Sequence, residues 1–94
     1  MGKLTNEAIV AGLKTLPGWS LNGDAIGKQY TLPSFPEAMK FVNKVAELAE
    51  QADHHPDILI NYRRVTLTLS THSEGGLTQK DFDLAATIEK GQSK

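Results

Sequence analysis

The sequence predicts an α+β fold: a four-stranded antiparallel sheet with three helices packed on one face, in the order helix, two strands, helix, two strands, helix. Two patterns lead to this prediction. Apolar residues recur at spacings of three and four along residues 38–52, which is typical of an amphipathic helix. Apolar and polar residues alternate along residues 65–71, which indicates a strand with one buried face and one polar face.

The composition indicates one globular domain spanning residues 1–94. Apolar residues make up 39%, charged residues 22%, and the formal charge is −1. This charge disfavours nonspecific binding to nucleic acid, which needs a basic face. The absence of cysteine excludes disulfides and sulfur-ligated zinc. No apolar run approaches the ~18 residues of a membrane helix, and the N-terminus lacks the apolar core of a signal peptide, so we expect a cytoplasmic protein without membrane contact.

The first third of the chain predicts a helix followed by a hairpin. Thr5 is suited to cap the helix, and Pro17-Gly18 ends it because proline cannot continue a helix. Strands are expected at residues 19–21 and 25–32, since residues 22–24 have the Asn-Gly-Asp sequence of a tight turn. One face of the second strand is expected to hold Ile26, Lys28 and Tyr30.

The longest predicted helix follows. Ser34 can be its N-cap, and Glu37, three residues later, completes the pattern of a capping box. The helix is expected to stop near Asp53 or His54, because Pro56 pushes the residue before it out of the helical region.

Two further strands and a last helix complete the chain. The strands are expected at residues 58–62 and 65–71. His72 closes the second of them and by parity belongs to its polar face. Thr78 is suited to cap the last helix, with Asp81 in the capping-box position.

An acid–base cluster is expected where the longest helix ends. Two histidines and three carboxylates lie close together in the sequence there: Glu50, Asp53, His54, His55 and Asp57. If the helix reaches His54, Glu50 lies one turn away on the same side and can orient this imidazole. Pro56 then sends His55 in another direction, and His72 could face both. Three imidazoles suit proton transfer near neutral pH, because their intrinsic pKa is roughly 6.5.

Each of these residues also has a purely structural interpretation. Histidines at a helix end can complement the helix dipole, and His72 can be a surface residue at a strand end. Asp81 is primarily a helix cap, and Trp19 and Tyr62 are core or half-buried sheet residues. A zinc site is the other chemical alternative, although neighbouring histidines rarely point at one ion. No nucleophile with a neighbouring base is recognisable, so a catalytic triad is not expected.

The spacing from this cluster to later residues forms a longer motif. It reads Glu50-x-x-x-His54-His55-Pro56, followed at fixed distances by Tyr62, His72 and Asp81. Three other segments accompany it: Pro17-Gly18-Trp19, Lys28-Gln29-Tyr30 and Leu69-Ser70-Thr71-His72. Together they resemble the pterin-4a-carbinolamine dehydratase family, from about Thr5 to about Glu89. The chain departs from the family at Lys80, where arginine is usual.

The resemblance implies a function. Such a protein removes water from 4a-hydroxytetrahydropterin to give quinonoid dihydropterin, with no metal or organic cofactor, and supports tetrahydrobiopterin recycling. It implies His54, His55 and His72 as catalytic residues. Glu50 and Asp81 would be supporting carboxylates, and Trp19 would lie near the pterin pocket.

For the individual roles we expect His54, oriented by Glu50, to be the main proton donor or acceptor, His72 the second acid–base group, and His55 a pterin-binding imidazole. The resemblance also implies a homodimer or homotetramer. Two alternatives remain open, because animal members of the family also bind a homeodomain transcription factor: a dimerisation cofactor for such a factor, or a non-catalytic pterin-binding module.

Overall fold

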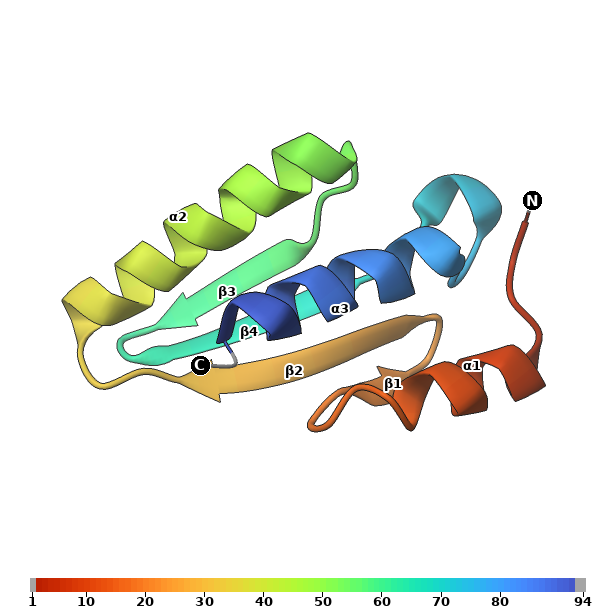
Figure 1. Ribbon diagram of the computed structural model, residues 1–94, viewed down its shortest axis with the longest axis horizontal. Helices are drawn as coiled ribbons and strands as arrows, with labels where there is room; N and C mark the ends of the chain where they lie inside the picture. Colours follow the sequence, from red (N-terminus) through yellow and green to blue (C-terminus); the bar gives the residue numbers. More distant parts are fainter. Residues whose placement is uncertain (1, 93–94) are drawn as a thin grey trace.

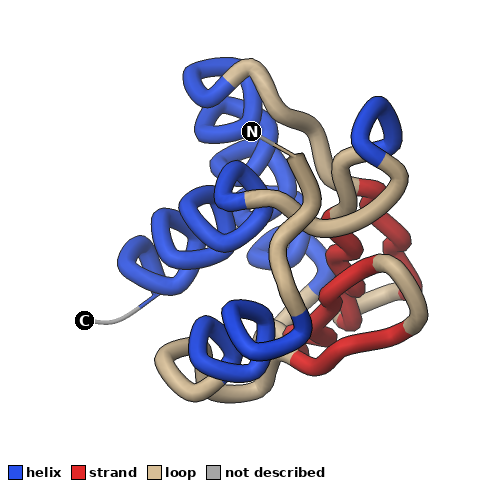
Figure 2. Tube along the Cα trace, turned by 90° about the vertical axis from the view of Figure 1, so that its right-hand side faces the viewer, coloured by secondary structure: helices blue, strands red, loops and turns tan. Residues whose placement is uncertain are grey.

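A computed structural model describes residues 2–92 of the protein. Its elements are α1 (Asn6–Leu13), β1 (Ser20–Asn22), β2 (Ala25–Thr31), α2 (Phe35–Ala52), β3 (Asp57–Asn61), β4 (Arg64–Leu69), the short 3-10 helix η1 (His72–Glu74) and α3 (Gln79–Gln92). The strands form one antiparallel sheet in the order β1-β2-β4-β3. Figure 2 shows the strands on one side of the molecule and the long helices on the other, which confirms the predicted fold class.

Local sequence signals account for the helix starts and the hairpin. The Thr5 hydroxyl accepts the Ala8 N–H at 3.1 Å, and the Ser34 hydroxyl accepts the Glu37 N–H at 3.2 Å, so the predicted caps of α1 and α2 are confirmed. The strands β1 and β2 are joined at Gly23 and Asp24, where Gly23 has a φ of 63° that glycine adopts without strain.

Cross-strand register sets the two faces of the sheet. Ile26 pairs with Leu69, Lys28 with Leu67 and Tyr30 with Val65, so the expected face of β2 is confirmed. The opposite face carries Gly27, Gln29, Thr66 and Thr68, and no helix within residues 2–92 covers it. The sheet therefore buries one face only, as the alternation in β4 predicted.

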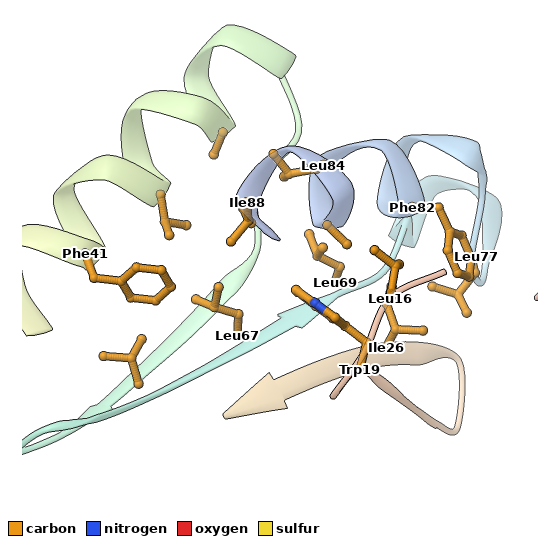
Figure 3. Close-up of a cluster of buried hydrophobic side chains, with 14 of the residues drawn as sticks. Leu16, Trp19, Ile26, Phe41, Leu67, Leu69, Leu77, Phe82, Leu84 and Ile88 are labelled. Carbon is orange, nitrogen blue, oxygen red and sulfur yellow. The ribbon is translucent and has the colours of Figure 1, made fainter. Parts of the chain in front are cut away.

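The core lies between the covered face and the helices (Figures 1 and 3). Fully buried apolar side chains come from the sheet, from α2 and from α3, among them Ile26, Leu67, Leu69, Val45, Leu84 and Ile88. Burying each such side chain stabilises the fold by roughly 1.5–3 kcal/mol. The packing fixes the ends of α2 and α3 relative to β4, and the histidines lie near those ends.

The fourth strand ends earlier than predicted. The strand β4 ends at Leu69, and Thr71 forms only an isolated bridge with Gly76. The Thr71 N–H donates to the Gly76 carbonyl at 2.9 Å, which folds the chain into a short loop. His72 therefore begins the 3-10 helix η1 and does not close the strand.

The helices of the described residues were also compared with the requirements of a bilayer. None between residues 2 and 92 has the length and apolar character needed to span a membrane.

Candidate active site

The end of α2 determines where the two adjacent histidines go. After Ala52 the chain enters the left-handed region at Asp53, with φ 53° and ψ 41°. The Asp53 N–H donates to the Glu50 carbonyl at 3.2 Å and the His54 N–H donates to the Ala49 carbonyl at 3.1 Å. These bonds form a Schellman motif, which ends the helix and turns the chain away from its axis.

The turn takes His54 away from Glu50 and brings it to α3. His54 Nε2 lies 2.5 Å from Asp81 Oδ1; the His54 side chain is 12% exposed and Asp81 is fully buried. The expected pairing of Glu50 with His54 is wrong, because His54 has left the helix on which that pairing depended. An ionised Asp81 can only accept, so Nε2 carries the proton it donates and Nδ1 remains for other partners.

Glu50 pairs instead with His55. Its Oε2 lies 2.5 Å from His55 Nε2, with His55 56% and Glu50 77% exposed. Such an exposed pair contributes only about 0–1 kcal/mol, so it orients the ring less firmly than the buried pair does. Each of the adjacent histidines therefore has its own carboxylate, one buried and one exposed.

Asp81 is held by two further donors. Its Oδ2 accepts the Thr71 hydroxyl at 2.8 Å and the Thr78 backbone N–H at 2.9 Å. The bond from Thr78 is the reciprocal half of a capping box, so the predicted capping role of Asp81 is confirmed. The same carboxylate caps α3 and holds His54.

Two hollows receive the histidines. A cavity of about 300 Å³ contains both His55 and His72; its other lining residues include Asp24, Asp57, Thr68, Ser70 and Gly76. A second hollow of about 290 Å³ lies between α2 and α3 and contains His54, with Lys80 and Asp83 among its lining residues. The structure thus brings His55 and His72 to one cavity. His54, the residue before His55, lies in the other hollow.

Trp19 lies elsewhere. It is 5% exposed, belongs to the core and lines neither histidine hollow. Its Nε1 donates to Glu89 Oε2 at 3.0 Å, and the same oxygen accepts Lys28 Nζ at 2.6 Å and the Tyr30 hydroxyl at 2.5 Å. The structure agrees with the alternative interpretation of Trp19 as a core residue.

This second cluster perturbs two ionisable groups. Burial raises the pKa of the Tyr30 phenol, and its hydrogen bond to the Glu89 carboxylate and the charge of that carboxylate raise it further. Burial also raises the pKa of the Glu89 carboxyl, but hydrogen bonds from Lys28, Tyr30 and Trp19 together outweigh burial. The pKa of Glu89 therefore lies below its usual value of 4.5.

The zinc alternative finds no support in the side-chain geometry. Within residues 2–92, no three His, Cys, Asp or Glu side chains are grouped so that they could hold a metal ion. The reason is visible at the end of α2, where the neighbouring rings of His54 and His55 face different carboxylates.

Thr71 is the site residue that the sequence analysis missed. A signal for it existed, because Thr71 has the same parity as Val65, Leu67 and Leu69 and is therefore a polar residue at a core-facing position. A buried hydroxyl needs a hydrogen-bond partner. Its partner Asp81 lies ten residues further on, and the spacing alone does not reveal that contact.

Fold and site together define a small protein equipped for acid–base chemistry at its histidines. Comparison with known proteins is consistent with this class. The family model described as Pterin 4 alpha carbinolamine dehydratase matches residues 2–91. The chain therefore belongs to this family of carbon–oxygen lyases.

Relatives in two bacteria support the assignment, both named "Putative pterin-4-alpha-carbinolamine dehydratase". The one from Roseiflexus castenholzii is 57% identical over 91 residues, which are 96% of this chain and 98% of the relative. The one from Thermomicrobium roseum is 52% identical over 88 residues, covering 94% and 95%.

Two solved structures share the fold. A transcriptional coactivator/pterin dehydratase from Brucella Melitensis superposes with a TM-score of 0.90 at 35% identity, covering 95% of this chain and 97% of that one. A pterin dehydratase-like RuBisCO assembly factor of the alpha-carboxysome has a TM-score of 0.64 at 20% identity, covering 77% and 83%. The second likeness concerns the fold alone.

Proposed function

We propose that the protein is a 4a-hydroxytetrahydropterin dehydratase that works by histidine acid–base catalysis and supports tetrahydrobiopterin recycling. The observation that carries this proposal is that buried Asp81 holds His54, while the next residue of the chain, His55, lines a cavity together with His72. The cavity volume of about 300 Å³ is at the lower end of the range for small-molecule sites and suits a bicyclic ring.

The reaction needs one acid and one base. The bond between C4a and its hydroxyl oxygen breaks, a proton from an acid completes the leaving water, and the N5 proton passes to a base as the C4a–N5 double bond forms. Both groups must come within hydrogen-bond reach of the substrate. Imidazoles suit both tasks at neutral pH.

We assign the base to His54. Asp81 accepts the Nε2 proton, so the neutral ring presents the lone pair of Nδ1, and the buried carboxylate stabilises the imidazolium that forms. This assignment keeps the expected role of His54 and replaces Glu50 with Asp81 as the residue that orients it.

We assign the acid to His72 and pterin binding to His55. Among residues 2–92 the His72 ring makes no side-chain hydrogen bond, so it is available to the leaving oxygen in the cavity that it lines. His55 faces the same cavity with one ring nitrogen on Glu50, which leaves the other for the substrate. The alternatives to a dehydratase are a non-catalytic pterin-binding module and a dimerisation cofactor for a transcription factor.

The test is a dehydration assay with freshly generated 4a-hydroxytetrahydropterin. Wild type should outpace the uncatalysed reaction, and His54→Ala and His72→Ala should each lower kcat by about 10²- to 10⁴-fold, which is the usual contribution of general acid–base catalysis. Circular dichroism controls for folding. A wild-type rate equal to the uncatalysed rate would refute the enzyme and favour the binding module.

We also propose that two copies associate along β3. This strand is at the edge of the sheet, and it leaves a row of backbone groups unpaired. Leu59 on β3 is 65% exposed, and the neighbouring Tyr62 is 67% exposed and stacks on Phe35 at a centroid distance of 6.5 Å. An antiparallel edge pairs with a copy of itself about a two-fold axis, which makes a second copy the fitting occupant.

A further inference from the structure

Thr71 occupies a position where the fold otherwise places apolar side chains. The three preceding residues of the same parity, Val65, Leu67 and Leu69, are all fully buried. Thr71 is 7% exposed, so its hydroxyl is removed from water together with them. A buried hydroxyl destabilises the fold unless it is hydrogen-bonded, and the identity of its partners therefore shows what this residue contributes.

The Thr71 hydroxyl connects Asp81 with Thr78. It donates to Asp81 Oδ2 at 2.8 Å and lies 2.8 Å from the Thr78 hydroxyl. Since a hydroxyl has a single proton and an ionised Asp81 can only accept, the Thr71 proton points to Asp81 and the Thr78 hydroxyl donates to Thr71. All three side chains are buried, where such bonds are stronger than in water.

The other oxygen of Asp81 is the one that holds His54, at 2.5 Å. The carboxylate is thus fixed from behind by Thr71 and by the Thr78 N–H, and it presents Oδ1 to the imidazole. Without the Thr71 proton, Oδ2 would keep one donor, and the carboxylate could rotate. The direction of His54 therefore depends on a hydroxyl that does not touch it.

The backbone of Thr71 holds the other end of the site. Its N–H donates to the Gly76 carbonyl at 2.9 Å, and its carbonyl accepts the Gly76 N–H at 3.3 Å and the Glu74 N–H at 2.9 Å. These bonds close the loop that begins at His72. One residue is therefore bonded through its side chain to the support of His54 and through its backbone to the loop of His72.

We propose that Thr71 is a positioning residue that sets His54 and His72 relative to each other. The proposal rests on the proposed function, since it takes both imidazoles to act on one substrate. Thr71 holds Asp81, and through Asp81 it fixes the ring orientation and the tautomer of His54. By analogy with the residues that orient metal-binding histidines, we expect its removal to lower activity by about 10- to 100-fold.

The experiment compares Thr71→Val with Thr71→Ser. Valine keeps the shape and the backbone bonds and removes the hydroxyl, whereas serine keeps the hydroxyl. Thr66→Val is the matched control, because Thr66 lies on β4, the strand that precedes Thr71, but faces the uncovered side of the sheet. The readouts are kcat and KM for the dehydration, and the ¹⁵N NMR signals of the His54 ring, assigned with His54→Ala.

Thr71→Val should lower kcat about 10- to 100-fold with little change in KM, and should convert the His54 signals from the Nε2–H tautomer to a mixture. Thr71→Ser should restore both, and Thr66→Val should change neither. A folded Thr71→Val protein with wild-type kcat and wild-type His54 signals would overturn the proposal.

Two further outcomes remain decisive. If wild type lacks dehydratase activity, the proposed function fails, and the NMR signals alone still decide whether Thr71 fixes the His54 tautomer. If Thr71→Val does not fold, Thr78→Val replaces it, because the Thr78 hydroxyl holds that of Thr71. It should move kcat and the His54 signals in the same direction, and unchanged values would overturn the proposal.

Discussion

At the scale of single residues, the backbone conformation of Asp53 determines which carboxylate pairs with which histidine. Its left-handed conformation turns the chain so that His54 pairs with Asp81, and His55 pairs with Glu50. The sequence predicted where α2 ends, since Pro56 limits the helix. It could not predict the backbone conformation of Asp53, because aspartate can adopt either the right-handed helical or the left-handed conformation. The partners of the histidines followed from that one conformation.

The conformation of Asp53 can be tested by substitution. A side chain at positive φ crowds the following carbonyl, a strain that is absent in glycine and costs roughly 1–2 kcal/mol in ordinary residues. We expect Asp53→Ala to unfold with a free energy about 1 kcal/mol below that of Asp53→Gly. Urea denaturation measures the difference. An alanine variant as stable as the glycine variant would show that Asp53 does not adopt this conformation in solution.

At the scale of elements, α3 is fastened at both ends. Asp81 ties its first turn to Thr71, which follows β4, and to His54, which follows α2. Glu89 ties its last turns to Lys28, Tyr30 and Trp19. The capping box predicted that Asp81 bonds to the start of α3, but not that it holds Thr71 and His54. The attachment through Glu89 was not predictable from the sequence. Lys28 at a core-facing position only made the alternation of apolar and polar residues in β2 imperfect. Its ammonium group lies there because the Glu89 carboxylate, 2.6 Å away, compensates its charge.

The attachment at Glu89 makes stability depend on pH. The pKa of Glu89 in the folded protein lies below its usual 4.5, so the folded state favours the ionised form. Its contribution is complete above pH 4.5 and is lost as the pH falls through the lowered pKa. We expect Glu89→Gln to lower the free energy of unfolding by about 1–3 kcal/mol at neutral pH.

This difference should shrink on acidification, as measured by urea denaturation at neutral pH and well below 4.5. Glu47→Gln, at an exposed position on α2, is the control and should behave like wild type throughout. A gap between Glu89→Gln and wild type that stays constant over this range would contradict the lowered pKa.

At the scale of the whole molecule, local sequence signals predicted the secondary-structure elements but not the order of the strands in the sheet. Turns, caps and alternation identified the three α-helices, the four strands and both hairpins of residues 2–92, but not the 3-10 helix η1, because each of the former depends on neighbouring residues. The pairing of β2 with β4 places Ile26 opposite Leu69, and the sequence of neither strand indicates which strand it pairs with. The same limit applies to His54 and Asp81, which only the packing of α2 against α3 brings together.

The exposed edge of the sheet gives the prediction at this scale. Leu59→Lys places a charge in the proposed contact between two β3 strands, so the protein should become monomeric by light scattering while its fold persists. Leu21→Lys is the matched control, because Leu21 is 48% exposed on the opposite edge strand. Dissociation by the control and not by Leu59→Lys would place the interface elsewhere.

We propose that the buried His54–Asp81 pair carries the proton transfer, and this role is measured by the kcat values of Asp81→Asn and Glu50→Gln. Asparagine keeps an oxygen for capping α3 but presents no carboxylate to His54, so Asp81→Asn should lower kcat about 10²- to 10⁴-fold. Glu50→Gln changes only an exposed pair and should lower kcat by about fivefold or less, the equivalent of ~1 kcal/mol. A loss in Glu50→Gln as large as that in Asp81→Asn would show that the buried pair has no special role in the proton transfer.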